Sequence, residues 1–286
     1  MSKEKTGVGI ITCNRPNYLI SLLQSLEQCK DSIDELVIIN DGKPLNNIEL
    51  FTGEIIVNEK NLGVAKSKNS ALKHLIKKKC NYFFLIEEDM IIKSPTVFTQ
   101  YIQAHKVSGI HHFNYGPGSP FNRKQTIQQY DLHNRHLLDE KSQPNPKLVV
   151  SYQNNIDIAL YEHTVAMFSF FTKEVLQKVG GFPEEYDRCW EHVDHTYQII
   201  KAGYHPPFWW FADLANSHEL MEEAPNAIQN SSIATDKQDW MDRVMKGREI
   251  YKEKHGHYPN QPPQHTKEQV LESLKLCYKK YATIKQ

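Results

Sequence analysis

The chain places an apolar run directly before three acids, in the stretch Tyr82-Phe83-Phe84-Leu85-Ile86-Glu87-Glu88-Asp89-Met90. Uncharged aromatic and aliphatic residues without alternation are typical of a strand buried on both faces, as in a parallel sheet. The acids need partners, because desolvating an unpaired carboxylate is costly. Since open α/β sheets bind ligands at the carboxyl ends of their strands, we expect the acids to line a site there. Carboxylates at such a site suit a hard divalent cation, and that cation suits a phosphate.

Similar apolar runs flank this strand along the first third of the chain. Strands are predicted at 7–12, at 35–42 with a polar turn at the end, and at 54–58. A helix is predicted at 18–26, and the segment 61–72 is predicted as a loop that enters a helix running to about Lys79. A further helix is expected to run to about Lys106, with Ser94 as its N-cap and Pro95 at its first position. Strands that alternate with helices predict a parallel sheet with right-handed crossovers.

The pattern changes after Gly109. A β-hairpin is predicted from strands at 148–152 and 156–160, and another strand at 165–171. Thr172 is expected to cap a short helix that ends at Gly180. Further helices are predicted at 191–202, 236–254 and 267–280, the last with a capping box of Thr266 and Gln269. The aromatic segment 206–211 is predicted as a strand or sheet edge.

Composition narrows the class of protein. The 286 residues include 34 basic and 34 acidic side chains, a balance that argues against an overall electrostatic nucleic-acid binder. Five scattered cysteines without a C-x-x-C pair predict reduced thiols. We find neither a signal-peptide pattern nor an apolar run of the roughly 18 residues that span a bilayer. These features predict a cytoplasmic protein, with peripheral membrane contact left open.

Several motifs in fixed order resemble those of the GT-A glycosyltransferases, and most closely the large family-two group. The motifs in the first half are Thr12-Cys13-Asn14-Arg15-Pro16, Ile39-Asn40-Asp41-Gly42, Asn61 to Asn69 and Glu87-Glu88-Asp89. Those in the second half are Gly180 to Glu185, Trp190-Glu191-His192-Val193-Asp194 and Gly203-Tyr204. The resemblance covers roughly residues 6–220, and residues 221–286 match no family motif.

This resemblance implies an α/β fold of GT-A type. We expect a mostly parallel central sheet flanked by helices (Rossmann-like), a mixed acceptor-binding half and a helical C-terminal extension. The corresponding boundaries are 1–107 for the nucleotide-sugar-binding half, 108–220 for the acceptor-binding and catalytic half, and 221–286 for the extension. The implied activity is sugar transfer from a nucleotide diphosphate, with a UDP-sugar as the expected donor. The acceptor is a carbohydrate or another hydroxyl-bearing molecule, nucleic acid included.

The resemblance implies Mn²⁺ or Mg²⁺ as cofactor and Asp89 as its ligand. Glu87 stands where the family's D-x-D motif has its first aspartate, and is expected to be the second ligand. His218 matches a late histidine that several GT-A enzymes place on the metal, and a histidine ligand favours Mn²⁺. Glu88 is assigned to the substrate, because successive strand residues face opposite ways.

Further resemblance-based assignments concern the donor. Thr12 and Arg15 follow the first strand, where the family binds uridine, and Asp41 stands where an acid binds the base or ribose. The alternatives are a surface charge for Arg15 and an ordinary turn aspartate for Asp41.

The segment 61–72 enters a helix whose N-terminus attracts phosphate, and it carries Lys66, Lys68 and Asn69. The family usually has arginine where Lys68 stands; lysine keeps the charge but loses the bidentate fork. The alternative is a solvated helix face.

A second cluster supplies the candidates for the general base that deprotonates the acceptor hydroxyl. The family usually has Glu-Asp where this chain has Glu191-His192, so the base stays open among three residues. We rank Glu191 first, Asp194 second, since residues three apart share a helix face, and His192 third. The alternative is that the acids complement the helix dipole.

Aromatic side chains mark the expected acceptor side. Trp190 is a candidate platform for a sugar ring, whereas at least one of Trp209 and Trp210 is expected in the core. The segment 116–120 is interpreted as a mobile lid or a plain surface loop.

Two other functions compete with sugar transfer by inversion. A sugar nucleotidyltransferase usually has a glycine-rich loop after its first strand, which 12–16 lacks. A catalytically degenerate nucleotide-sugar-binding protein would explain Glu87 and the missing Glu-Asp pair. A retaining mechanism is a further variant.

Overall fold

The computed structural model describes residues 3–45, 48–49, 51–124, 143–186, 189–227, 230–231, 236–259 and 265–284. Its centre is a six-stranded sheet with the order β3-β2-β1-β4-β9-β6. The strands are β1 (Thr6–Thr12), β2 (Glu35–Asn40), β3 (Glu54–Val57), β4 (Tyr82–Glu87), β6 (His112–Asn114) and β9 (Phe168–Thr172). The first four are parallel, and β9 runs antiparallel to both β4 and β6. This confirms the predicted α/β fold with a mostly parallel sheet.

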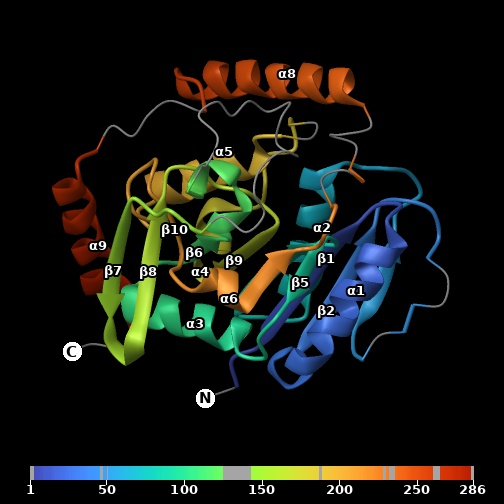
Figure 1. Ribbon diagram of the computed structural model, residues 1–286, viewed down its shortest axis with the longest axis horizontal. Helices are drawn as coiled ribbons and strands as arrows, with labels where there is room; N and C mark the ends of the chain where they lie inside the picture. The colour runs from blue at the N-terminus through green and yellow to red at the C-terminus, as the bar shows by residue number, and fades with distance from the viewer. Residues whose placement is uncertain are drawn as a thin grey trace.

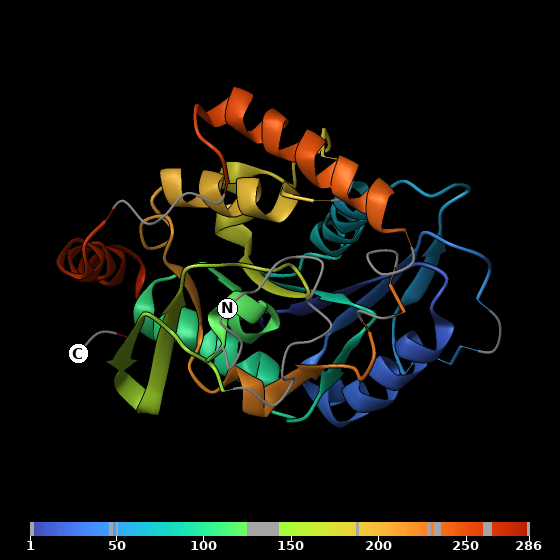
Figure 2. The same ribbon diagram turned by 45° about the horizontal axis from the view of Figure 1, so that its top comes forward.

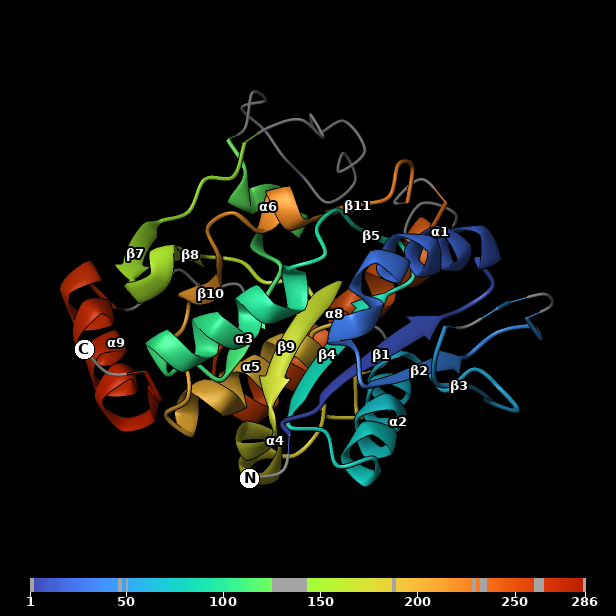
Figure 3. The ribbon, with the colours of Figure 1, turned by 90° about the horizontal axis from the view of Figure 1, so that it is seen from below.

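Helices cover both faces of this sheet (Figures 1 and 3). One face packs on α1 (Pro16–Leu26) and α3 (Val97–Ser108), and the other on α2 (Val64–Lys77) and α4 (Lys173–Val179). Along β4, Phe84 and Ile86 join the first core, whereas Phe83 and Leu85 join the second. A β-carbon on Gly9 of β1 would lie 2.8 Å from the β-carbon of Ala71, so glycine lets α2 approach the sheet.

The second half adds an antiparallel sheet of the order β10-β8-β7. Its strands are β7 (Leu148–Tyr152), β8 (Ile156–Tyr161) and β10 (Phe211–Leu214). The hairpin of β7 and β8 confirms the prediction. The strand expected at 206–211 is wrong over most of its length, because β10 begins only at Phe211. Trp209 and Trp210 are both 5% exposed, so the aromatic run serves the core.

Shorter elements connect these layers. A two-stranded ribbon of β5 (Met90–Ile92) and β11 (Met221–Glu223) follows the acids, with α6 (Ser217–Leu220) just before β11. The 3₁₀ turns are η1 (Glu27–Ser32), η2 (Gly116–Gly118), η3 (Pro120–Asn122) and η5 (Gln153–Asn155). Residues 116–120 are all buried, which corrects their interpretation as a surface loop. The cap predicted at Ser94 lies two residues later, at Thr96.

The C-terminal part contains two long helices (Figure 2). α8 (Lys237–His255) is capped by Asp236 and lies beside α5 (Glu191–Lys201). α9 (Lys267–Tyr281) has the predicted capping box of Thr266 and Gln269 and packs near α3. Since residues 221–223 form a strand, the helical extension begins after β11. The described part of the chain contains no helix long and apolar enough to cross a membrane.

Candidate functional site

A cleft of about 750 Å³ opens at the carboxyl ends of β1, β2 and β4. Side chains from both halves of the fold line it, among them Thr12, Arg15, Asp41, Glu87, Glu88, Asp89, Trp190, Glu191 and His192. The segments 119–121, 163–167 and 230–231 and two residues of α8 complete its wall. The structure therefore brings nine of the fourteen predicted site residues to one cavity.

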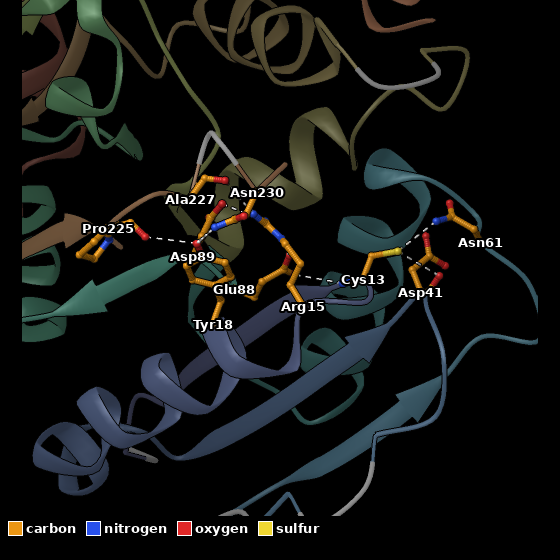
Figure 4. Close-up of polar contacts among 10 residues, drawn as sticks. All are labelled: Cys13, Arg15, Tyr18, Asp41, Asn61, Glu88, Asp89, Pro225, Ala227 and Asn230. Carbon is orange, nitrogen blue, oxygen red and sulfur yellow. Dashed lines mark hydrogen bonds and ion pairs between the residues drawn. The ribbon is translucent and has the colours of Figure 1, made fainter. Parts of the chain in front are cut away.

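The acids after β4 point in different directions. Glu87 faces α2, where its Oε1 lies 3.0 Å from Lys68 Nζ. Glu88 turns toward the first strand and accepts from the Cys13 N–H (3.1 Å) and from Arg15 Nε (2.6 Å). Asp89 follows on the same side, with Oδ2 2.8 Å from Arg15 Nη2 (Figure 4). β4 ends at Glu87, so Glu88 and Asp89 lie in the turn that follows, and both face Arg15. Glu88 is therefore not separated from Asp89, which corrects the expectation from strand alternation.

Burial sets the charge state of this group. Burial raises the pKa of Glu88 to about 7, although Arg15 opposes that shift. The pKa of Asp89 is also raised, chiefly by burial and then by the charge of Glu87. The three carboxylates face two cations, Arg15 and Lys68, and Lys68 is shared with Glu191, so the cluster favours additional positive charge.

The donor set fits a hard divalent cation at Asp89. Its Oδ1 is buried and has no hydrogen-bond partner, while Oδ2 is held by Arg15. Glu87 contributes a nearby second carboxylate, 31% exposed. Within the described residues, no group of three His, Cys, Asp or Glu side chains gathers to hold a metal. This resembles sites where Mg²⁺ uses one or two carboxylates and completes its shell with substrate phosphates and water.

The structure does not bring His218 to this site. His218 lies on α6, before the β5–β11 ribbon, and does not line the cleft. At the end of that ribbon next to His218, Met221 pairs with Ile92. At the opposite end, the Ala224 N–H donates to the Asp89 carbonyl (2.7 Å). The ribbon therefore separates His218 from Asp89, and the prediction of a histidine ligand is corrected.

Lys68 connects the two sides of the cleft. Its side chain is 1% exposed, and its Nζ lies 3.0 Å from Glu87 and 3.4 Å from Glu191. Burial lowers the pKa of Lys68, but the two carboxylates outweigh that effect and raise it. This lysine is committed to internal ion pairs, which corrects its prediction as a phosphate ligand.

Glu191 and His192 form a pair at the start of α5. Glu191 is 2% exposed, and its Oε1 lies 3.4 Å from His192 Nδ1 as well as from Lys68 Nζ. Burial raises the pKa of Glu191, but His192 and then Lys68 reverse this and lower it to about 2. A carboxylate so held is a poor base, whereas the half-buried His192 ring lines the cleft.

Asp194, the second-ranked base, points elsewhere. It is fully buried and accepts from Tyr186 Oη, Gln198 Nε2 and His255 Nε2, all at 2.9 Å. Lys254 Nζ lies 2.8 Å away. Asp194 thus joins α5 to α8, and its prediction as a catalytic residue is corrected.

Asp41 shapes the wall of the cleft beside β1. Its carboxylate accepts from the N–H groups of Leu62 (2.8 Å) and Gly63 (2.9 Å) and from Asn58 Nδ2 (2.9 Å). It lies next to Cys13, whose Sγ accepts from Asn61 (Figure 4). Asp41 therefore fixes the loop that leads into α2 while facing the cleft.

Thr12 and the residues of α2 differ in their access to the cleft. Thr12 lines it with a buried hydroxyl that has no hydrogen-bond partner. Lys66 is exposed and lies outside it. Asn69 also lies outside, because it holds the backbone of Phe182 through Nδ2 (2.9 Å) and Oδ1 (2.7 Å). Lys66 and Asn69 are thus not brought to the donor site.

The aromatic side of the cleft includes a residue that sequence reasoning missed. Trp190 lines it as predicted, and its Nε1 donates to the Val244 carbonyl on α8 (3.0 Å). Trp240 and Val244 also line the cleft. Because α8 matches no family motif, its tryptophan at position 240 is the feature of the sequence that could have indicated this role.

The sheet, the acids at the end of β4 and the helix across the cleft that carries Glu191 and His192 are features of a GT-A-like glycosyltransferase. The chain is 25% identical over 244 residues to the uncharacterized glycosyltransferase R363 of Acanthamoeba polyphaga mimivirus, covering 82% of this chain and 83% of that protein. This likeness confirms the expected enzyme class, a glycosyltransferase. No protein-family profile matches the chain.

Solved structures show partial likeness. The mannosyltransferase PcManGT from Pyrobaculum calidifontis, solved with GDP-Man and Mn²⁺, has a TM-score of 0.47 at 13% identity. It matches 71% of this chain and 54% of its own. TarS of S. aureus has a TM-score of 0.46 at 18% identity, over 68% of this chain and 33% of its own. The chain thus spans about half and a third of these two proteins.

Proposed function

We propose that this protein transfers a sugar from a nucleotide diphosphate donor, expected to be UDP-linked, to an acceptor hydroxyl with inversion. The observation that carries the proposal is the placement of His192 in the same cleft as Asp89. A base for the acceptor and an anion-compensating site for the leaving group are the two parts that the reaction needs.

The donor side is built from the ends of β1, β2 and β4. Asp89 would hold a divalent cation through Oδ1, which is buried without a partner, with Glu87 as the second carboxylate. A bound Mn²⁺ or Mg²⁺ neutralises charge on the departing diphosphate. Thr12 and Asp41 line the adjoining wall, which we assign to the base and ribose. An acid-rich cleft repels a diphosphate unless such charge is supplied.

On the acceptor side, Glu191 and His192 act as an oriented pair. The carboxylate at Nδ1 favours a proton there, so Nε2 is the acceptor. Nε2 takes the proton of the acceptor hydroxyl, whose oxygen bonds to the anomeric carbon. The bond from that carbon to the diphosphate oxygen breaks, and the nucleotide diphosphate leaves with the electron pair. Trp190 and Trp240 offer flat faces to the acceptor.

Thermal-shift measurements test the donor site. UDP with Mn²⁺ should raise the melting temperature, because a ligand stabilises the folded state by RT ln(1 + [L]/Kd). EDTA should remove the shift, and Asp89→Ala should abolish it in a variant that still unfolds cooperatively without ligand. Stabilisation by another nucleotide alone would overturn the UDP assignment, and no stabilisation by any nucleotide diphosphate would overturn the donor site.

A transfer assay tests the reaction. Incubation with UDP-sugars and a panel of hydroxyl acceptors should release UDP, and NMR of the product should show an anomeric configuration opposite to that of the donor. Retained configuration would overturn the inverting mechanism. Tight UDP binding with neither transfer nor donor hydrolysis would make the protein a nucleotide-sugar-binding protein.

A further inference from the structure

Arg15 forms ion pairs with two carboxylates of the proposed donor site, Glu88 and Asp89. Its Nε donates to Glu88 Oε1 (2.6 Å) and its Nη2 to Asp89 Oδ2 (2.8 Å) (Figure 4). The side chains of Glu88 and Asp89 are only 7% and 10% exposed. Because buried carboxylates need a counter-charge, the guanidinium is the positive group that compensates both acids here.

Other contacts hold Arg15 in this position. It directly precedes Pro16 at the start of α1, and its Nη1 donates to the Ala227 carbonyl (3.4 Å). Its guanidinium lies 5.3 Å from the ring centroid of Tyr18, whose hydroxyl donates to the Pro225 carbonyl (3.2 Å). Several contacts thus hold Arg15 in the cleft wall, and the alternative prediction that it is a plain surface charge is wrong.

A divalent cation on Asp89 conflicts with this arrangement. One oxygen of Asp89 is held by Arg15, and the other is buried without a partner. A cation bound there would lie close to the guanidinium, and two positive groups in a half-buried cleft repel each other strongly. The guanidinium also fits a diphosphate, because its planar fork makes paired hydrogen bonds to phosphate oxygens.

We propose that Arg15 and the divalent cation exchange places on Asp89. Arg15 neutralises Asp89 and Glu88 when no donor is bound, and cation binding releases Nη2 to the donor's diphosphate. The Nε bond to Glu88 persists, because it is made by a different N–H group and to a different carboxylate. The inference rests on the proposed function and assigns Arg15 to the diphosphate, whereas the family resemblance implied the uridine.

Cation affinity without nucleotide tests the exchange. Calorimetric titration should show that Arg15→Gln binds Mn²⁺ at least tenfold more tightly than the wild type. In saturating Mn²⁺ the same variant should bind UDP at least tenfold more weakly, because the diphosphate has lost its fork. Arg15→Lys should lie between, since lysine keeps the charge without the fork.

Arg243→Gln is the matched control. Arg243 forms an arginine–carboxylate pair with Asp239 on α8 (2.7 Å), and neither residue lines the cleft. Its loss should leave both affinities within twofold of the wild type. Equal or weaker Mn²⁺ binding by Arg15→Gln would overturn the exchange.

Measurements on the wild type do not depend on the folding of a variant. In protein with labelled arginine, the Arg15 Nη2 signals should shift on adding Mg²⁺ with UDP, whereas its Nε signal should stay hydrogen-bonded. Unchanged Nη2 signals at saturation would overturn the proposal. Failure of the proposed function is distinguishable, because the wild type would then bind no nucleotide diphosphate at all.

Discussion

Nδ1 of His192 lies 3.4 Å from Oε1 of Glu191, and the same oxygen lies 3.4 Å from Nζ of Lys68. The carboxylate orients the imidazole, and the lysine holds the carboxylate. In the proposed mechanism these side chains are a base, the acid that orients it and the cation that holds the acid, and the half-buried His192 ring lines the cleft. The proposed function therefore takes His192 as the base, although Glu191 ranks first on the sequence alone.

Removal of the imidazole should abolish proton transfer without abolishing donor binding. We expect His192→Ala to lower kcat by about 10²- to 10⁴-fold, the usual contribution of a general base. UDP affinity in Mn²⁺ should stay within threefold of the wild type. Initial rates and calorimetry check the two quantities, and a variant with full activity would exclude His192 as the base.

His218→Ala is the matched histidine variant. His218 lies at the end of the β5–β11 ribbon that is remote from Asp89. Its loss should therefore leave both kcat and Mn²⁺ affinity within twofold of the wild type. Mn²⁺ titration and initial rates measure this. A large loss of Mn²⁺ affinity would restore His218 as a ligand.

Lys66 and Lys68, on the same helix, allow the effect of losing a buried lysine on stability to be compared with that of losing an exposed one. Lys68→Met leaves Glu87 and Glu191 without their shared cation, and breaking a buried pair typically costs about 3–5 kcal/mol. Lys66→Met changes an exposed residue and should alter the free energy of unfolding by less than about 0.5 kcal/mol. Urea unfolding of both variants measures the difference.

Equal stability of the two variants would contradict the internal role of Lys68. The activity of Lys68→Met, assayed well below its melting temperature, should also fall, because Glu191 loses the contact that holds it against His192.

Local patterns predicted much of the fold. The buried run of β4, the hairpin of β7 and β8 and the capping box of α9 were all predicted from periodicity and turn chemistry. The antiparallel insertion of β9 between β4 and β6 was not, because pairing partners depend on long-range contacts. The run 206–210 failed for a related reason, since an aromatic segment suits a strand and a core equally.

The site was predicted less completely than the fold. Residues adjoining strand ends, such as Asp41 and Asp89, reached the cleft because the sheet fixes where strands end. Whether a helical residue reaches the cleft depends on how the helix is rotated about its axis. Glu191 lies in the cleft wall, whereas Asp194, one turn later on α5, lies under α8. The prediction that His218 binds the metal rested on its position in the chain order alone, and chain order does not fix distances in space.

Asp194 should matter for stability and not for chemistry. Its carboxylate accepts three hydrogen bonds and pairs with Lys254, and these partners outweigh burial to lower its pKa. Asp194→Asn should lower the free energy of unfolding by about 1.5–3 kcal/mol, the range for hydrogen bonds to charged groups. At temperatures where the variant is folded, kcat should stay within threefold. A thousandfold loss of kcat with unchanged stability would instead make Asp194 catalytic.

Buried histidines should make the protein sensitive to mild acid. Burial lowers the pKa of His105, of His195 and of His205 to about 4 in each case, against an ordinary value near 6.5 in the unfolded chain. Between these two values the unfolded state binds more protons. The contribution of the neutral histidines to the free energy of unfolding is therefore complete above about pH 6.5, and it is lost progressively as the pH falls toward 4.

Each such histidine contributes a slope of up to about 1.4 kcal/mol per pH unit, so the three together contribute up to about 4 kcal/mol per unit. Urea unfolding at pH 7.5, 6.0 and 5.0 measures the slope. His105→Asn removes one titrating ring, and the asparagine amide nitrogen takes the place of Nδ1, which lies 2.9 Å from the Ile110 carbonyl oxygen. The slope of that variant below pH 6.5 should be smaller by about one histidine's share, and an unchanged slope would show that His105 is not held neutral by its burial.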